Sequence, residues 1–298
     1  MCIRKTLILA LLAVAVAALA GGSAGTAQTA GPIKVVAAEN FYGDVARQIG
    51  GPEVEVVSVL SNPDQDPHLF ETSPAVLRQL AAAQVVIYNG ADYDPWMPKL
   101  LAAAQRPGRT AIVAADLLGR KSGDNPHLWY DPATMPAVAR AIAATLANAD
   151  PAHAADYETR LAAFLASLKP IDDKIDAIRK KFAGSAVTAS EPVFGDMAAA
   201  LGLTMRNEKF QLAIMNDTEP AARDVAAFES DLKERRVRAM FYNKQASDKI
   251  VQHLVDIARA AKIPVVGVTE LVPAGMTFQD WLLSELAETE KALAGPNS

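Results

Sequence analysis

Short runs of β-branched and other apolar residues alternate along this chain with segments whose apolar residues recur at helical spacing. The runs predict strands at 33–37, 54–60, 85–88, 111–114, 186–189, 203–205, 237–242 and 264–268. The longer segments predict helices at 41–49, 74–83, 96–104, 134–149, 196–201, 220–233, 248–261 and 278–293. Because the two kinds of element alternate without hairpin signals, the pattern predicts an α/β fold with mainly parallel sheets flanked by helices. Ser73 and Thr134 are expected to cap the helices that begin beside them.

Residues 151–182 break this alternation. They have apolar residues at helical spacing and no glycine, and a continuous helix of about 30 residues would be roughly 45 Å long. Pro170 is expected to interrupt it. The segment is either two ordinary helices of one domain or a helix that connects two lobes. The second interpretation gives an N-terminal α/β lobe at 31–150, a connecting long helix at 151–183 and a C-terminal α/β lobe at 184–298.

Residues 1–30 have the pattern of a secretory signal peptide. Arg4 and Lys5 precede an unbroken apolar run of 14 residues, which is shorter than the ~20 residues of a transmembrane helix. The only cysteine, Cys2, precedes this run, whereas the cysteine of a lipobox would follow it. We therefore expect a periplasmic protein whose signal peptide is cleaved and which has neither a lipid anchor nor a disulfide.

The composition restricts the kinds of partner. Hydrophobic residues make up 51% and charged residues 21% of the chain, which indicates a packed core rather than disorder. The net charge of −5 becomes −7 when Arg4 and Lys5 are removed with the signal peptide. No basic stripe is present, so the sequence argues against nucleic acid as a partner.

Four polar side chains stand where ligands of a metal ion would be expected. His68 and His127 lie in two Pro-His-Leu units 59 residues apart. Glu191 and Glu270 directly follow predicted strands, and parallel sheets bind ligands beyond such strand ends. We expect the two histidines of the first half and the two glutamates of the second to lie at equivalent positions of two half-repeats. Two neutral imidazoles and two carboxylates suit zinc, manganese or iron(II) better than calcium or magnesium.

Each of these residues has an ordinary explanation when taken alone. A histidine in a loop is commonly a surface residue, and a carboxylate at a strand end commonly caps the next helix. The metal hypothesis therefore rests on the four residues together. Of the other two histidines, His153 is expected on the surface, and His253 is expected to be a surface or packed residue rather than a ligand. The tryptophans are expected in the core or lining a pocket: Trp96, Trp129 and Trp281.

These motifs, in this order, resemble the solute-binding proteins of metal-specific ATP-binding-cassette importers, the zinc and manganese family. The resemblance spans the mature chain. It is carried by Ile-Lys-Val-Val-Ala-Ala-Glu-Asn-Phe-Tyr at 33–42, Asp-Pro-His-Leu-Phe-Glu at 66–71, Asn-Pro-His-Leu-Trp-Tyr-Asp-Pro at 125–132, the long helical segment, and the strand end with Glu-Pro-Val-Phe-Gly at 189–195.

The resemblance implies two α/β lobes joined by one rigid long helix, with the metal in the cleft between them. His68 and His127 match the family's first two ligands. Glu191 matches the third, which is often His in zinc binders and Glu in manganese binders. Glu270 stands where the family usually has an aspartate, which is one methylene shorter, and Asn243 is a neighbouring alternative for this fourth ligand.

Three departures from the family pattern bear on the metal. Residues 69–126 lack the His-rich loop of many zinc-binding members, Pro170 interrupts a helix that is usually smooth, and Asp196 replaces a common aromatic residue. Asp196 is expected to be a partner of a ligand or an extra acidic group near the site. Two carboxylates favour manganese, although the Irving–Williams order predicts that zinc binds more tightly in vitro.

The resemblance implies a periplasmic protein that is not an enzyme. It would bind manganese or zinc with high affinity, with iron also open, and deliver the metal as a transported ligand to the membrane permease of an importer. We expect a monomer whose rigid helix limits lobe closure, and whose affinity falls below pH ~6.5 as the histidines are protonated. Asp66 and Asp131 are the expected partners of the histidine rings.

Three other functions stay open at this point. A zinc hydrolase would use Glu191 as a general base beside an open coordination position. A binder of an organic metal chelate would share the long-helix architecture without needing inward His and Glu side chains. A surface adhesin is disfavoured by the missing lipobox.

Overall fold

The computed structural model describes residues 31–63, 70–245 and 249–295. Residues 32–298 group as one compact unit. The predicted signal peptide lies outside the described residues, as do His68 and Asp66, so the predictions about them stay predictions. None of the helices in the described ranges combines the length and apolar character needed to cross a bilayer.

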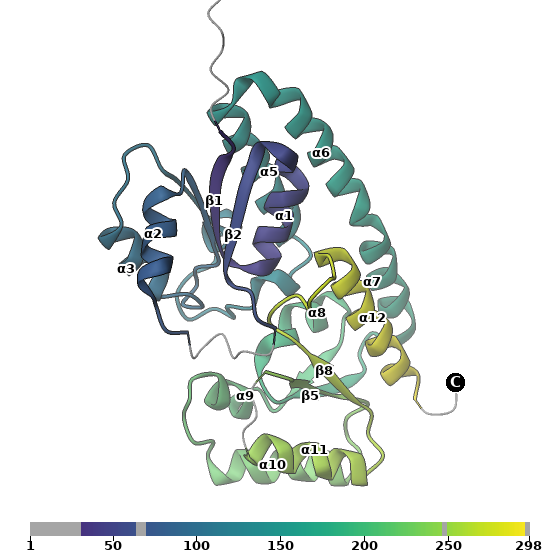
Figure 1. Ribbon diagram of the computed structural model, residues 1–298. Coiled ribbons are helices and arrows are strands. Elements are labelled where there is room, and N and C mark those ends of the chain that lie inside the picture. The colour runs from purple at the N-terminus through teal and green to yellow at the C-terminus, as the bar shows by residue number, and fades with distance from the viewer. Residues whose placement is uncertain (1–30, 64–69, 246–248, 296–298) are drawn as a thin grey trace, which may run out of the picture. The chain divides into compact units, whose positions relative to one another are not determined.

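The first sheet contains four parallel strands in the order β2-β1-β3-β4, of which the neighbours β1 and β2 are labelled in Figure 1. These strands are β1 (Ile33–Glu39), β2 (Val54–Leu60), β3 (Val85–Tyr88) and β4 (Thr110–Val113). Its helices are α1 (Asn40–Gly50), α2 (Pro74–Ala82), α3 (Trp96–Ala103), α4 (Ala114–Leu118) and α5 (Thr134–Ala149). The β-branched residues of the central strand β1 pair in register with both neighbours; Val35, for example, lies opposite Val56 and Val85.

The second sheet repeats this arrangement, with the strand order β6-β5-β7-β8, again all parallel. Its strands are β5 (Ala186–Ala189), β6 (Thr204–Arg206), β7 (Met240–Asn243) and β8 (Val265–Val268). Its helices are α8 (Gly195–Ala200), α9 (Glu208–Met215), α10 (Ala222–Lys233), α11 (Lys249–Ala260) and α12 (Phe278–Ala294). The prediction of an α/β fold with parallel sheets is therefore confirmed.

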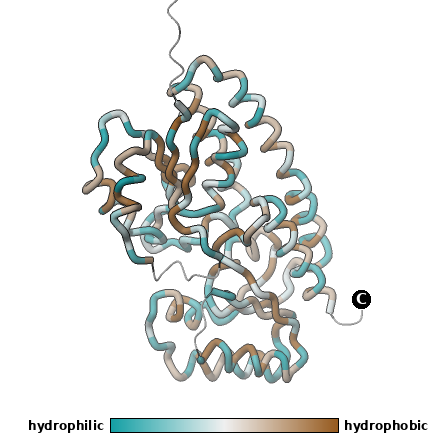
Figure 2. The backbone as a smooth tube through the Cα atoms, in the orientation of Figure 1, coloured by the Kyte–Doolittle hydropathy of each residue, from teal (hydrophilic) through white to brown (hydrophobic). Residues whose placement is uncertain are grey.

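One apolar core runs through both sheets. It includes β1 residues such as Val35, β5 residues such as Val187, and the inward faces of α1, α5 and α12. Each sheet also has a separate core on its other face, under α2 and α3 in the first sheet and under α9, α10 and α11 in the second. Figure 2 shows hydrophobic residues concentrated along the strands. Both sheets are thus covered on two faces, as parallel sheets require.

Two helices, α6 (Ala154–Ser167) and α7 (Lys169–Phe182), connect the sheets. They meet at Leu168, and Pro170 lies in the first turn of α7. Proline has no N–H group and cannot continue the hydrogen bonding of an α-helix. The chain instead makes tighter bonds there, from Leu168 N–H to Leu165 O (3.3 Å) and from Ile171 N–H to Leu168 O (2.9 Å). The predicted interruption at Pro170 is confirmed.

The two helix caps predicted from sequence have different outcomes. Ser73 accepts a hydrogen bond from the Val76 N–H at 3.4 Å and caps α2 as predicted. Thr134 is the first residue of α5 rather than its cap, and that prediction is wrong. Its hydroxyl donates to the carbonyl of Leu128, which turns it away from the helix N–H groups.

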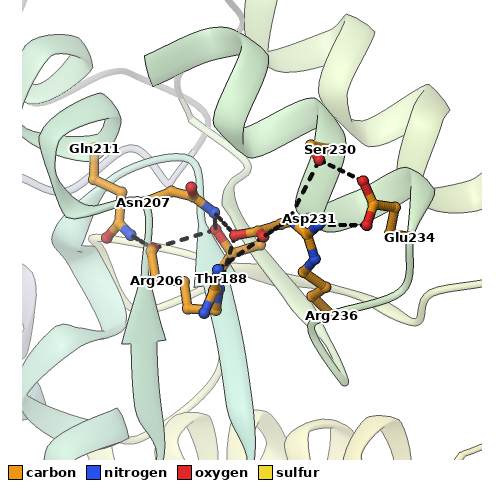
Figure 3. Close-up of polar contacts among 8 residues, drawn as sticks. All are labelled: Thr188, Arg206, Asn207, Gln211, Ser230, Asp231, Glu234 and Arg236. Atoms are coloured by element: carbon orange, nitrogen blue, oxygen red, sulfur yellow. Dashed lines mark hydrogen bonds and ion pairs between the residues drawn. The ribbon is translucent and has the colours of Figure 1, made fainter. Parts of the chain in front are cut away.

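The sequence pattern missed α4 and α9. Figure 3 shows the polar contacts that place α9. Asp231 of α10 accepts two hydrogen bonds from Arg206 at the end of β6, at 2.7 and 2.8 Å, and one from Asn207 at 3.1 Å. Asn207 has a left-handed backbone (φ 62°), and its side chain also donates to Thr188 of β5. These contacts fix the turn from which α9 begins.

Candidate metal site

Three polar residues gather at the carboxyl ends of neighbouring strands in the second sheet. Glu191 follows β5, Asn243 ends β7, and Glu270 follows β8. The Asn243 Nδ2 donates to Glu270 Oε1 at 2.6 Å and to Glu191 Oε2 at 3.4 Å. Its Oδ1 accepts the N–H of Gln245 at 2.9 Å. Because a main-chain N–H can only donate, this contact turns the amide nitrogen of Asn243 toward the two carboxylates.

His127 reaches the same place from the first sheet. It lies between α4 and α5, directly after Pro126, and is fully buried. Its Nε2 is 3.6 Å from Glu270 Oε2. This separation is longer than a hydrogen bond. It is close to the ~3.4 Å expected between two ligands that each lie ~2.1 Å from one tetrahedral ion. The predicted ligands His127 and Glu270 are therefore brought together, and Asn243 brings Glu191 to Glu270.

Tyr93 also contacts Glu270 across the two sheets. Its hydroxyl donates to Glu270 Oε2 at 2.9 Å. Burial, followed by the charge of Glu270, raises the pKa of Tyr93 well above its ordinary value, so the hydroxyl keeps its proton. The ring lies edge-on to Trp129 at 4.8 Å between centroids. Sequence reasoning missed this residue, although its position in the loop after β3 obeys the same strand-end rule.

The loop that carries Tyr93 is held by a buried pair of carboxyl groups. Asp94 accepts the N–H groups of Asn89 and Gly90 at 2.7 and 2.8 Å, and burial raises its pKa to about 6. Glu39, at the end of β1, is fully buried, and burial together with Asp94 raises its pKa well above the ordinary value. Glu39 and Asp94 are thus a buried pair of carboxyl groups, and burial favours the protonated form of Glu39.

The identical strand orders allow the positions of the two sheets to be compared. His127 follows β4 and Glu270 follows β8, which are corresponding strands. Glu191 follows β5, and the corresponding strand β1 ends at Glu39 rather than near His68, which follows β2. The expectation of equivalent positions therefore holds for the strands that precede His127 and Glu270. His68 lies outside the described residues, so its pairing with Glu191 stays a prediction.

The predicted partner of the His127 ring is corrected. Asp131 accepts from Arg120 at 3.0 Å and from the Ala133 N–H at 2.9 Å. The ring contact of His127 is made instead by Asn125, whose Oδ1 lies 2.7 Å from Nδ1. The sequence placed Asn125 only two residues before His127, but the loop conformation that turns its amide back to the ring could not be inferred from that spacing.

Asp196 belongs to an ion-pair group beside the site. Its carboxylate lies 3.4 Å from the same Arg120 guanidinium that holds Asp131. Burial raises the pKa of Asp196, and the charge of Arg120 opposes this shift. Arg120 thus joins the chain just after His127 to the first turn of α8.

The remaining histidines and the tryptophans lie where they were expected. His153 is exposed and pairs with Asp150 at 2.6 Å. With Glu53 and Asp156 it forms a surface group whose possible ligand atoms lie within 4.8 Å of one another; Glu53 is already paired with Arg160, and we assign this group no metal. His253 is exposed beside Glu229. Among the tryptophans, Trp129 and Trp281 are fully buried.

The fold has two lobes, each with a parallel sheet of the same strand order, joined by a helical connection. A histidine and carboxylates, which are common metal ligands, meet between the two sheets. These features define a two-lobed binding protein of the metal-binding class. The family model described as zinc-uptake complex component A, periplasmic (ZnuA), matches residues 35–292. The chain therefore belongs to this family, and the resemblance found in the sequence is confirmed.

Named relatives in this family differ in their metal. The manganese-binding lipoprotein MntA of Bacillus subtilis is 24% identical over 76% of this chain and 76% of its own length. The iron ABC transporter substrate-binding lipoprotein MtsA of Streptococcus pyogenes is 27% identical over 57% of this chain and 60% of its own length. The periplasmic zinc-binding protein TroA of Treponema pallidum has the same fold, with a TM-score of 0.75, 19% identity, and coverage of 89% of this chain and 99% of TroA.

Proposed function

We propose that this protein is the metal-binding component of an ATP-binding-cassette importer. It binds one divalent transition metal in the periplasm and delivers it to the membrane permease, and it acts as a binding protein rather than as an enzyme. The observation that most supports this is the meeting of His127 and Glu270, from corresponding strand ends of two sheets, at a separation suited to two ligands of one ion.

The proposed ligands are His68 and His127 from the first lobe and Glu191 and Glu270 from the second. The orientation of the Asn243 amide favours Glu270 as the fourth ligand, because Asn243 turns its nitrogen, a donor, toward the carboxylates. Two carboxylates and two neutral imidazoles would balance the charge of a divalent ion in a buried site. This donor set accepts manganese, zinc or iron(II), with the two carboxylates favouring manganese.

In this proposal the lobes are residues 31–150 and 184–298, connected by 151–183, and the protein works as a monomer after removal of its signal peptide. Neither lobe alone carries the complete ligand set. Tyr93 of the first lobe and Asn243 of the second donate hydrogen bonds to Glu270 from two sides and fix its orientation. This preorganisation lowers the entropy that metal binding must remove.

Metal analysis of purified protein tests the proposal. The mature chain is purified without chelators, and its metal content is measured by mass spectrometry beside His127→Ala and a matched control, His253→Ala, which removes an exposed histidine. We expect one equivalent of metal in the parent and the control, and loss of metal in His127→Ala. A parent without stoichiometric metal, or undiminished metal in His127→Ala, would overturn the proposal. Competition at defined free-metal levels then ranks manganese, iron and zinc.

A further inference from the structure

Asn125 lies between His127 and the main chain that follows β5. Its Oδ1 lies 2.7 Å from the ring Nδ1 of His127 and also accepts the His127 N–H at 3.2 Å. Its Nδ2 donates to the carbonyl oxygen of Pro192 at 3.0 Å. Pro192 directly follows Glu191. One amide therefore contacts a proposed ligand of the first lobe and the neighbour of a proposed ligand of the second.

These contacts determine which nitrogen of His127 carries the proton. A carbonyl oxygen can only accept, so the Asn125 atom that faces Pro192 is the nitrogen. The oxygen then faces His127, and the neutral ring must donate through Nδ1–H. Nε2 keeps its lone pair, and Nε2 is the atom 3.6 Å from Glu270 Oε2. A main-chain carbonyl of the second lobe thus selects the ring nitrogen that is available to a metal.

Gly195, at the start of α8, leaves the space that this contact needs. Its φ of −60° is an ordinary helical value, so the backbone does not require glycine there. A Cβ atom at this position would lie 3.0 Å from Nδ2 of Asn125, which is closer than such contacts normally come. The close approach of α8 to Asn125 explains the glycine.

We propose that Asn125 is a positioning residue of the metal site, which sets the tautomer of His127 and ties this ligand to the second lobe at Pro192. This inference rests on the proposed function for its effect on metal binding, but its effect on the ring needs no metal. Aspartate at position 125 would keep the acceptor for His127 and lose the donor to Pro192, whereas alanine would lose both. Without that acceptor, the Glu270 carboxylate attracts the ring proton to Nε2, where it blocks a metal.

The tautomer is measured directly in the metal-free protein. The chain has four histidines, so long-range ¹H–¹⁵N NMR resolves their rings, and His127→Ala identifies the signals of this one. We expect the Nδ1–H form in the parent and in Asn125→Asp, and a population of the Nε2–H form in Asn125→Ala. An Nε2–H ring in the parent, or an unchanged ring in Asn125→Ala, would overturn the inference.

Zinc affinity, measured by chelator competition near neutral pH, tests the consequence. Loss of a residue that orients a ligand weakens metal binding by about 10- to 100-fold, and we expect Asn125→Asp at the lower end and Asn125→Ala at the upper end. Gly195→Ala, which crowds the Asn125 amide without removing it, should weaken binding less. The matched control is Asp131→Asn, in the same loop but bound to Arg120, and it should bind zinc like the parent.

The outcomes separate this inference from the proposed function. Parental affinity in both Asn125 variants would overturn the positioning role even though the parent binds zinc. A parent that binds no metal would overturn the proposed function, while the NMR result would still decide the role of Asn125 in fixing the His127 ring. Amide spectra that match the parent establish that each variant is folded.

Discussion

Glu285 should make the metal-free protein less stable as the pH rises from acid to neutral. This residue of α12 is buried, and burial raises the pKa of its carboxyl to about 7. Its Oε1 accepts the N–H of Thr269 at 3.1 Å and the indole N–H of Trp281 at 2.9 Å, and its Oε2 contacts the hydroxyl of Tyr130 at 2.5 Å. Tyr130 Oη also lies 2.7 Å from the carbonyl oxygen of Thr269.

The single hydroxyl proton of Tyr130 cannot serve both acceptors. When Glu285 is protonated, it donates to Tyr130, and Tyr130 donates to the carbonyl of Thr269, so every group has a partner. When Glu285 is ionised, its carboxylate accepts the hydrogen bond of the Tyr130 hydroxyl. The carbonyl of Thr269 then receives no hydrogen bond from Tyr130. The protonated form of Glu285 is therefore the one that the folded protein favours.

The sign and size of the effect follow from the two pKa values. The pKa is about 7 in the folded protein and 4.5 for an ordinary glutamate, so the folded state binds the proton more tightly. The resulting stabilisation is complete below pH 4.5 and is lost as the pH rises to about 7. The difference corresponds to about 3 kcal/mol of unfolding free energy.

Glu285→Gln isolates this contribution. The glutamine amide can donate to Tyr130 as the protonated acid does, and its oxygen can accept from Thr269 and Trp281. Urea unfolding of chelator-treated protein should give nearly equal stabilities for parent and variant near pH 4, and a variant more stable by about 3 kcal/mol near pH 8. Glu288→Gln, an exposed position of the same helix, is the control and should follow the parent. A stability difference between Glu285→Gln and the parent that does not change between these pH values would refute this reasoning.

Two further predictions concern the metal site and the arrangement of the two lobes around it. Tyr93→Phe removes the hydroxyl that donates to Glu270 and should weaken metal binding by about tenfold, measured by chelator competition; an affinity equal to that of the parent would show that Tyr93 does not orient this carboxylate. Small-angle scattering of metal-free and metal-loaded protein should give nearly equal radii of gyration, because buried hydrogen bonds such as Tyr130 to Thr269 already join the two sheets; a large contraction on loading would contradict this.

Regular elements with clear patterns were predictable from the sequence. β-branched runs located the strands, and Ser73 before Pro74 located the start of α2. The short helix α4 was missed because it follows β4 without any polar boundary, at Val113–Ala114. The start of α9 depends on the tertiary contacts of Asn207 with Thr188 and Asp231, which no local pattern reports.

In the candidate site, only residues that follow predicted strands could be predicted from the sequence. His127 and Glu270 each follow the last strand of their own sheet, where ligand-binding residues of parallel sheets are expected, and the two residues meet between the sheets. Tyr93 could not be assigned, since its partner Glu270 lies 177 residues away. Glu39 lies beyond the strand predicted at 33–37 and was not identified, because the burial beside Asp94 that raises its pKa arises only when the lobe is assembled.

The joint at Leu168 also has a mechanical consequence. On one side of it, α6 packs against α1 and α5; on the other, α7 packs against α12 and pairs Lys181 with Glu290 at 2.6 Å. The connection therefore consists of two helices, each packed against one lobe, and we expect it to bend mainly at their junction, where Pro170 has removed a hydrogen bond. None of the described groups at the metal site lies at this point. The residues at which we expect the connection to bend are thus different from the described residues of the candidate metal site.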